Sequence, residues 1–251
     1  TGILTDDRGT IYRTTDGGVQ WQPVENLGFG TLWSAQFVSS TVAYVGGSFG
    51  TILKSTDAGL TWELFENIDT YRDFFHIRFA DASTGWAVGD YGAIFKTTNG
   101  GSTWIHLSTE PKGEMSQTFF ASTKVGYSVG EEGACLKTTD GGYNWRKLDL
   151  GYYLWMYGLI FLNENTGWVV GDSGLILKTG NGVNFFRQTS GLEEDMLPLY
   201  SIYFVDGNYG WACGSTFGII LKTTNGGSVW THETTDVGSD LQKIKFFNST
   251  K

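Results

Sequence analysis

The stretch Thr97-Thr98-Asn99-Gly100-Gly101-Ser102-Thr103-Trp104 decides the fold, because its pattern returns five more times along the chain. The other copies are TTDGGVQW (14–21), STDAGLTW (55–62), TTDGGYNW (138–145), TGNGVNFF (179–186) and TTNGGSVW (223–230). Their last aromatic residues stand 41 to 44 residues apart. A repeat of this length indicates an array of similar structural units rather than a set of unrelated domains.

The repeated pattern has the chemistry of a tight turn that satisfies its own backbone. Its third residue is Asp or Asn, whose side-chain oxygen accepts hydrogen bonds from nearby N–H groups, and the glycines that follow supply positive φ angles. The final aromatic residue can bury ~150–250 Å², worth roughly 4–6 kcal/mol before entropy is subtracted. We therefore predict six structural turns, capped by Asp16, Asp57, Asn99, Asp140, Asn181 and Asn225 and anchored by Trp21, Trp62, Trp104, Trp145, Phe186 and Trp230.

These copies resemble the Asp-box, or BNR repeat, S/T-x-D/N-x-G-x-T/S-W/F, of bacterial sialidases, xyloglucanases and sortilin-type receptors. The resemblance implies β-propeller scaffolding rather than catalysis. Between the copies each repeat reads as four short strands, for example 76–79, 85–88, 93–96 and 104–107. Four strands in about 42 residues is the size of one propeller blade. An aromatic pair seven residues apart, such as Phe79 and Trp86, recurs and is expected to pack between neighbouring blades.

The sequence therefore predicts an all-β fold, a six-bladed β-propeller of four-stranded antiparallel blades that forms a single domain over residues 1–251. The predicted blades are 33–65, 74–107, 116–148, 157–188 and 199–232, with a first blade assembled from 241–251 and 1–24. The repeat phase runs from Phe247 past the C-terminus onto Ile3, so strand 241–247 is expected to pair with the N-terminal blade. Such closure removes exposed sheet edges. A truncated longer array is the alternative.

Composition limits the classes of partner. The formal net charge is −9 and no run of Lys or Arg occurs, which argues against binding nucleic acid or an anionic membrane through bulk electrostatics. No apolar run of ~18 residues is present, so no membrane insertion is expected. The chain shows no signal peptide and starts within a repeat, as a mature or trimmed chain would. We expect Cys135 and Cys213 to be buried and unbridged.

No cofactor and no metal are expected. His106 and His232 occupy the same position of repeats three blades apart and cannot share a metal ion or a catalytic triad. Arg13, Arg146 and Arg187 read as solvated charges of outer strands, and the Arg-Ile-Pro signature that opens sialidases is missing. A sialidase active centre is therefore not expected.

A second resemblance comes from the string GWAVGDYGAIFKTTNGGSTW (85–104) and its relatives GWVVGDSGLILKT (167–179) and GWACGSTFGIILKTTNGGSVW (210–230). These strings are similar to the photosystem II assembly/stability factor family and its bacterial relatives outside photosynthesis. The resemblance implies a non-catalytic propeller that binds another protein and is exported across a membrane. Photosynthetic members have seven blades and an arginine-rich patch, whereas here the six arginines are scattered. Secreted or surface propellers of bacteria are the closer comparison, which implies an extracellular, cell-surface or periplasmic location.

The turn between the second and third strands is the candidate binding element. The position of Asp90 is acidic in four of the six repeats, through Asp7, Asp90, Glu131 and Asp172. A carboxylate before x-Gly suits a hairpin turn, so these residues either serve the turn or form an acidic contact surface. Up-and-down topology puts the same turns beside the blade-to-blade connectors, which contribute Tyr71, Tyr152, Tyr153, Trp155, Glu193 and Glu194.

We therefore expect a non-catalytic protein-binding or assembly scaffold that acts through the face opposite the Asp-box-like turns, where connectors differ in length and sequence. Two alternatives stay open. Carbohydrate binding or glycoside hydrolysis would use aromatic platforms, with Asp90 and Glu131 as the candidate carboxylate pair. A self-assembling surface protein would pack propeller against propeller. A protein partner is thus expected first and a glycan second.

Overall fold

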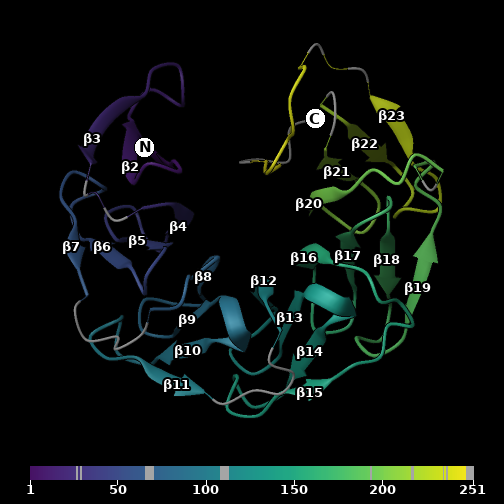
Figure 1. Cartoon of the computed structure of the whole chain (residues 1–251), viewed down its shortest axis with the longest axis horizontal. Helices are drawn as coiled ribbons and strands as arrows, with labels where there is room; N and C mark the ends of the chain where they lie inside the picture. The colour runs from purple at the N-terminus through teal and green to yellow at the C-terminus, as the bar shows by residue number, and fades with distance from the viewer. Residues whose placement is uncertain are drawn as a thin grey trace. The chain divides into compact units, whose positions relative to one another are not determined.

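The computed structural model describes residues 1–26, 28, 30–65, 71–107, 113–192, 194–215, 218–233, 235 and 237–246. It divides into two compact units, Thr1–Thr118 with Gly142–Trp145 and Phe119–Gly141 with Arg146–Lys251. The described residues form strands and no α-helix, apart from two single-turn 3-10 segments, η1 (Asp90–Gly92) and η2 (Glu131–Gly133) (Figure 1). No helix in that part of the chain is long and apolar enough to cross a membrane.

In the first unit each sheet pairs consecutive strands antiparallel. The first sheet has three strands, β1 (Gly2–Thr5), β2 (Thr10–Thr14) and β3 (Gln22–Asn26). The second has β4 (Leu32–Phe37), β5 (Ala43–Gly47), β6 (Ile52–Ser55) and β7 (Glu63–Leu64). The third has β8 (His76–Phe79), β9 (Gly85–Val88), β10 (Ile94–Thr97) and β11 (Ile105–Leu107).

The division between the units passes through the fourth sheet, which has β12 (Met115–Phe120), β13 (Gly126–Gly130), β14 (Cys135–Thr138) and β15 (Arg146–Lys147). The fifth has β16 (Met156–Phe161), β17 (Gly167–Gly171), β18 (Ile176–Thr179) and β19 (Phe185–Gln188). The sixth has β20 (Leu199–Phe204), β21 (Gly210–Gly214), β22 (Ile220–Thr223) and β23 (Thr231–Glu233). Six such meanders are the blades of a β-propeller, so the predicted fold class is confirmed.

Stacked aromatic rings form the core between consecutive sheets. The second strand of one sheet stacks on the first strand of the next through Tyr44 with Phe79, Tyr127 with Phe161 and Trp168 with Phe204, with ring centroids 3.6–3.9 Å apart. Packing also requires the glycine that precedes Trp168. A Cβ on Gly167 would lie 2.4 Å from the ring of Phe161, so only glycine leaves room for that ring. In the pair Gly167-Trp168, the glycine thus leaves room for the Phe161 ring of its own sheet, and the tryptophan stacks on Phe204 of the next sheet.

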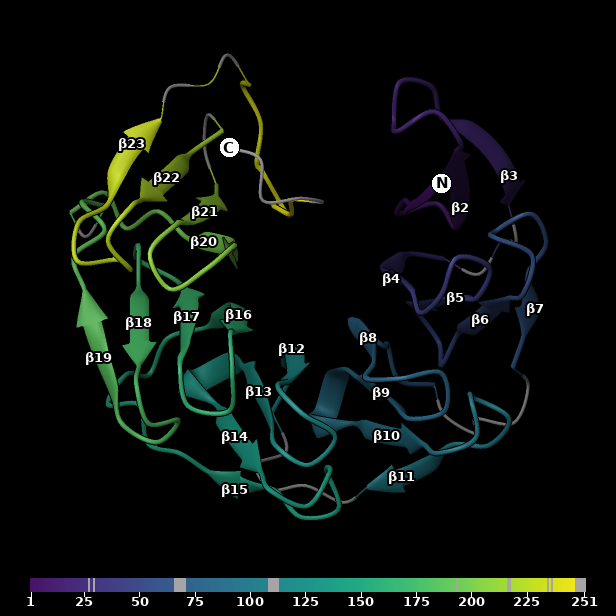
Figure 2. The ribbon, with the colours of Figure 1, turned by 180° about the vertical axis from the view of Figure 1, so that it is seen from behind.

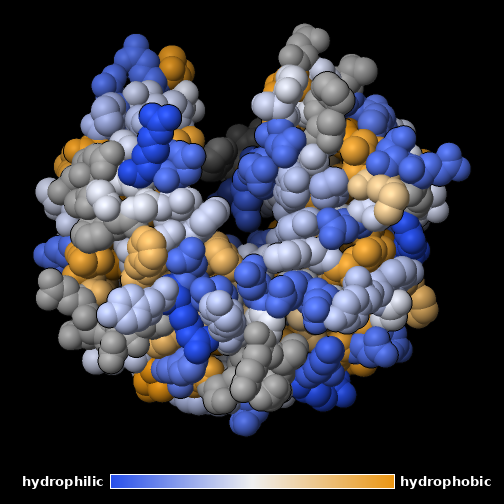
Figure 3. All heavy atoms as spheres, viewed as in Figure 1, coloured by the Kyte–Doolittle hydropathy of each residue, from blue (hydrophilic) through white to orange (hydrophobic). Residues whose placement is uncertain are grey.

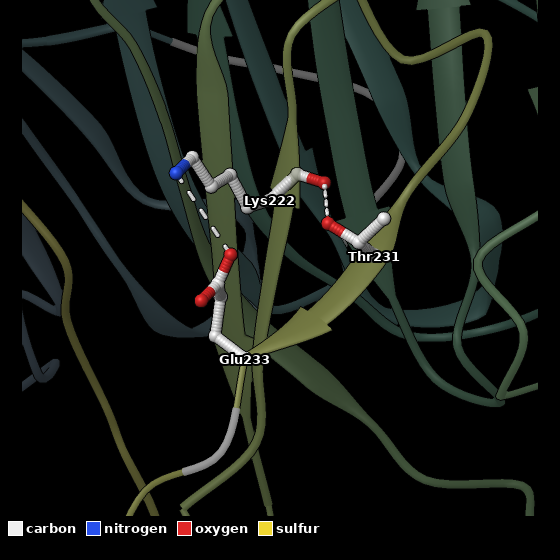
Figure 4. Close-up of polar contacts among 3 residues, drawn as sticks. All are labelled: Lys222, Thr231 and Glu233. Atoms are coloured by element: carbon white, nitrogen blue, oxygen red, sulfur yellow. Dashed lines mark hydrogen bonds and ion pairs between the residues drawn. The ribbon is translucent and has the colours of Figure 1, made fainter.

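A lysine or arginine on the strand that precedes the Asp-box-like turn ties most sheets to the next. The side chains donate to carbonyl oxygens in the following Asp-box-like turn, from Arg13 Nε to Ala58, Lys54 Nζ to Gly100, Lys137 Nζ to Gly182 and Lys178 Nζ to Gly226, over 2.7–3.1 Å. The interpretation of Arg13 as a solvated charge is therefore wrong, because its guanidinium completes a turn. Lys222, the equivalent residue of the sixth sheet, makes a 3.9 Å ion pair with Glu233 (Figure 4). An exposed pair of this kind adds about 0–1 kcal/mol.

Residues 241–246 form no strand, although the repeat predicts one over 241–247. They nevertheless take the place of a first strand against the sixth sheet (Figure 2). Leu241 N donates to Gly214 O at 3.0 Å, as Phe74 N donates to Gly47 O, and Ile244 N donates to Ser201 Oγ. A strand needs a backbone ladder. The bonds that join these residues to the sixth sheet are one backbone bond at Leu241 and bonds to the side chains of Cys213 and Ser201. Their pairing with the three-stranded N-terminal sheet stays a prediction.

The ring that fills the aromatic position of this segment is that of Phe246, whose centroid lies 4.3 Å from that of Trp211. Phe247, to which the repeat assigns this place, lies outside the described residues. The cysteines behave as expected, since both Cys135 and Cys213 are buried and free.

Candidate functional site

Backbone hydrogen bonds place the loops of each sheet in two groups. Turns between third and fourth strands bond to turns between first and second strands, as Gly100 N does to Ser83 O and Gly226 N to Asn208 O, both at 2.8 Å. Turns between second and third strands bond instead to blade connectors. Gly50 N donates to Arg72 O, Gly133 N to Leu154 O and Gly174 N to Leu197 O, each at 2.7 Å. We call this second group the connector face.

The connector face is defined separately in each unit. In the first unit it comprises turns 48–50 and 90–92 and connector residues 71–75. In the second unit it comprises turns 131–133 and 172–174 and connector residues 151–155 and 194–198. The η2 turn faces the viewer in Figure 1. The same view in Figure 3 is mostly hydrophilic, with its strongly apolar side chains in separate groups.

The Asp-box-like turns use their side chains on their own backbone. Thr97 Oγ1 donates to Asn99 Oδ1 at 3.0 Å and accepts from Gly101 N at 2.9 Å. Asn99 Oδ1 also accepts from Thr103 N at 2.9 Å. Equivalent bonds recur around Asp16, Asp57, Asn181 and Asn225, and Thr138 donates to Asp140. Such committed side chains offer a partner little that distinguishes one turn from another.

The aromatic residues that end these turns are not equally buried. Trp62 and Trp230 are each 8% exposed, whereas Trp21 is 38% and Phe186 70% exposed. The prediction of six buried anchors is therefore wrong at Trp21 and Phe186. Phe186 lies on β19, the last strand of its sheet, which has a neighbouring strand on one side only. The turn motif fixes local hydrogen bonds, but burial depends on what the next sheet offers.

The first unit holds two predicted site residues, Tyr71 and Asp90. Tyr71 is 90% exposed. The neighbouring Arg72 donates from Nη1 to Tyr91 O at 2.9 Å, and its guanidinium lies 5.8 Å from the Tyr91 ring. Burial, then the Asp73 carboxylate, raises the pKa of Asp90, while Arg72 opposes the rise. Asp90 N donates to Asp73 O, so its backbone serves the turn.

The second unit brings several predicted residues together. Connector 151–155 lies between turns 131–133 and 172–174, because Gly133 N donates to Leu154 O and Asp172 N to Trp155 O. Tyr153 is 74% exposed, and a hydrogen bond to Glu132 raises the pKa of its phenol. Glu131 is half-buried in the same turn. Tyr153, Trp155, Glu131 and Asp172 therefore belong to one surface.

Asp172 organises an aromatic group that the sequence only partly revealed. Its carboxylate accepts from Trp155 N at 3.3 Å and from Tyr157 Oη at 3.0 Å. The Trp155 and Tyr157 rings are nearly parallel with centroids 6.0 Å apart, and Tyr200 meets Tyr157 edge-on at 5.2 Å. Sequence reasoning missed Tyr157 and Tyr200. Each is the second residue of the first strand of its sheet, at the point where the register with the second strand shifts. The signal that could have revealed them was an aromatic residue at the same position of two consecutive repeats.

The remaining predicted residues are more scattered. Tyr152 is half-buried, with its ring 5.9 Å from the Arg187 guanidinium. Glu194 is exposed in the next connector, and Glu193 lies outside the described residues. Asp90 and Glu131 belong to different units, so their pairing as a carboxylate dyad stays a prediction.

The chemistry of the second unit's surface suits recognition. Burial, followed by the hydrogen bond to Asp172, raises the pKa of Tyr157, so its phenol is a donor rather than an activated nucleophile. Burial raises the pKa of Cys135 to about 12 and of Cys213 to about 11, which keeps both thiols protonated and unreactive. Among the described residues, no three His, Cys, Asp or Glu side chains gather where they could hold a metal ion.

Comparison with known proteins places this fold in a family. Residues 65–155, 108–198 and 144–245 each match the model of the Photosynthesis system II assembly factor YCF48 family. Two similar solved structures are YCF48 bound to D1 peptide and YCF48 from Cyanidioschyzon merolae. Each is 20% identical with a TM-score of 0.50, over 87% of this chain and 88% and 90% of theirs. No curated protein matches the chain significantly.

A glycoside hydrolase of family GH74 from Niastella koreensis is also similar, at 17% identity and a TM-score of 0.75, over 92% of this chain but 43% of the enzyme. At such identities the solved structures show the fold alone. The family assignment rests instead on the three matched stretches, which together extend over residues 65–245. The repeated strings that end in Gly-Gly-x-x-Trp lie largely within them. The chain therefore belongs to the Photosynthesis system II assembly factor YCF48 family.

Proposed function

We propose that the chain is a non-catalytic assembly scaffold that binds a protein segment on the connector face of its second unit. Family membership supports a protein-binding role, and a solved structure of YCF48 has a D1 peptide bound. The proposed binding residues are Tyr153, Trp155, Glu131 and Asp172, with Tyr152 and Glu194 at the margin. Tyr71 and Asp90 offer a second, separate contact in the first unit.

One observation carries the proposal. The aromatic group of Trp155, Tyr157 and Tyr200 lies beside the exposed Tyr153, and backbone bonds from turns 131–133 and 172–174 hold its connector in place. Aromatic side chains that are fixed before binding lose little entropy on contact, and Trp and Tyr dominate binding hot spots.

Site-directed photo-crosslinking tests the proposal in cells that make the protein naturally. A benzophenone amino acid replaces Tyr153 in one variant and Phe186 in the other. The two positions are similarly exposed, at 74% and 70%, in the same unit. We expect a discrete protein adduct from position 153 that Trp155→Ala reduces, and none from position 186. An adduct from position 186 alone would assign binding to the outer strand instead.

Carbohydrate binding is the second candidate. The row of Trp155, Tyr157 and Tyr200 beside Asp172 has the composition of a sugar platform, and the GH74 enzymes share the fold. A glycan array separates the two candidates, because a chain that binds only protein should bind none of the arrayed glycans. Self-association is the third, and light scattering over a range of concentrations detects it.

We also propose that the protein acts outside the cytoplasm, at a bacterial surface or in the periplasm. The support is the resemblance to exported bacterial propellers of this kind. Cell fractionation with antibodies against the folded chain tests this location. Recovery with cytoplasmic markers alone would overturn it.

A further inference from the structure

We propose that the partner segment is cationic, and that a stretch of protein carrying Lys or Arg beside apolar residues docks on the connector face of the second unit. This inference rests on the proposed function and names the chemistry of its partner. It follows from three observations, on charge, on aromatic geometry and on a comparison between the two units.

The segments that form this surface carry charge of one sign, and Arg187 of the outer strand β19 lies at its margin, 5.9 Å from the Tyr152 ring. The segments that define it carry five carboxylates and no Lys or Arg. The carboxylates are Glu131, Glu132, Asp172, Glu194 and Asp195. Three of them, Glu132, Glu194 and Asp195, are exposed, so an approaching cation meets them with little desolvation. The chain as a whole has a net charge of −9, which also favours encounter with a basic partner.

The aromatic rings beside these carboxylates suit the same partner. Lys and Arg bind the faces of Tyr and Trp rings, and Arg does so most often. The chain already uses this contact internally, since Lys96 Nζ lies 3.7 Å from the centroid of the Tyr143 ring. The Tyr153 phenol bonds to Glu132, and the Tyr157 phenol, whose ring lies 6.0 Å from that of Trp155, bonds to Asp172. Met196, 70% exposed, adds an adaptable apolar contact for neighbouring residues.

The first unit shows how such a surface accommodates a cation. There Arg72, from the connector, lies against the ring of Tyr91 and close enough to Asp90 to oppose part of the rise that burial and Asp73 cause in the pKa of that carboxyl. The hydrogen bonds from Gly50 N to Arg72 O and from Gly133 N to Leu154 O show that Leu154 is the equivalent connector residue of the second unit. Since Asp90 N donates to Asp73 O and Asp172 N to Trp155 O, Asp172 and Ser173 match Asp90 and Tyr91. The second unit therefore keeps the carboxylate, has Leu154 in place of Arg72, and takes its rings from Tyr153 and Trp155 of the connector. The partner supplies the cation.

A display library of random short peptides, selected on the wild-type chain, provides the probe. We expect enriched peptides with net positive charge whose binding weakens as NaCl is added. Fluorescence anisotropy then compares variants. Tyr153→Ala and Glu132→Gln should each weaken binding by about tenfold. Glu132→Gln keeps an acceptor for the Tyr153 phenol, so its effect reports charge rather than a displaced ring.

Two controls keep the outcomes distinct. Glu164→Gln removes the same charge from an exposed turn whose backbone carbonyl accepts from Tyr127, on the side of the Asp-box-like turns, and Phe186→Ala removes an exposed ring. Both should change binding less than about twofold. Enriched peptides without excess positive charge that still need Tyr153 would overturn the cationic partner and leave the proposed function standing. Peptides indifferent to Tyr153 and Glu132, or no enrichment at all, would overturn both.

Discussion

Asp57 shows how a single side chain holds one of the repeated turns. Its carboxylate accepts from Thr61 Oγ1 at 2.6 Å, from Thr61 N at 2.9 Å and from Leu60 N at 3.0 Å, and Ser55 Oγ donates to it at 2.8 Å. These bonds, first those of Thr61, hold the pKa of Asp57 well below its usual value of 3.8. A carboxylate that accepts several hydrogen bonds favours its charged form.

The depressed pKa of Asp57 makes the stability of the turn depend on pH. Because the folded pKa lies below the unfolded value, the carboxylate stabilises the fold fully above about pH 4 and loses that contribution as pH falls further. We expect Asp57→Asn to flatten the fall of melting temperature below pH 4, measured by circular dichroism from pH 2 to pH 7. Asp195→Asn, at an exposed position without these turn bonds, is the control. If the melting temperature of both variants falls with pH as steeply as that of the wild type, protonation of Asp57 does not affect the stability of the fold.

At the scale of the element, the aromatic residues that end the Asp-box-like turns should contribute unequally to the free energy of unfolding. We expect Trp62→Ala to lower the free energy of unfolding by about 3–5 kcal/mol, because it empties a buried site, and Phe186→Ala to lower it by less than about 0.5 kcal/mol. Urea unfolding measures both. Equal losses at the two positions would mean that the turn motif, rather than the neighbouring sheet, determines the contribution of its aromatic residue.

The same contrast explains how much of the fold could be predicted from the sequence. The strands at 76–79 and 85–88 agree with the structure residue for residue, because alternation and flanking glycines are local signals. The stacking of Tyr127 on Phe161 also follows from spacing. The exposure of Phe186 does not, because it depends on packing between elements. The group of Tyr157 and Tyr200 was not predicted, because each residue lies at a register shift between two strands and the sequence does not reveal that shift.

At the scale of the whole molecule, the C-terminal segment tests how the array ends. Deleting residues 241–251 removes the Leu241 bond to Gly214 and the Phe246 contact with Trp211. We expect a lower melting temperature and aggregation, because the large apolar ring of Trp211 loses its cover. Deleting 247–251 alone keeps both contacts and is the control. An unchanged, monomeric and cooperatively melting 1–240 chain would contradict a structural role for the segment.

The candidate site was less predictable than the fold because it lies where the repeats differ. Connectors such as 151–155 have no internal copy to compare, so their composition indicated a surface but not its contacts. The link between Tyr153 and Glu132, and the role of Asp172 in holding Trp155, emerged only from three-dimensional geometry. The prediction that these residues form a binding face therefore needs a measurement on the intact chain.

Amide hydrogen exchange of the chain, alone and with the partner captured by crosslinking at position 153, tests the central claim most directly. Binding on the connector face of the second unit should slow exchange in 131–133, 151–155 and 172–174. The Asp-box-like turns at 138–145 and 179–186 should exchange as in the free chain, because their side chains bond their own backbone. Slower exchange in those turns, with no change in 131–133, 151–155 or 172–174, would contradict the proposed binding face.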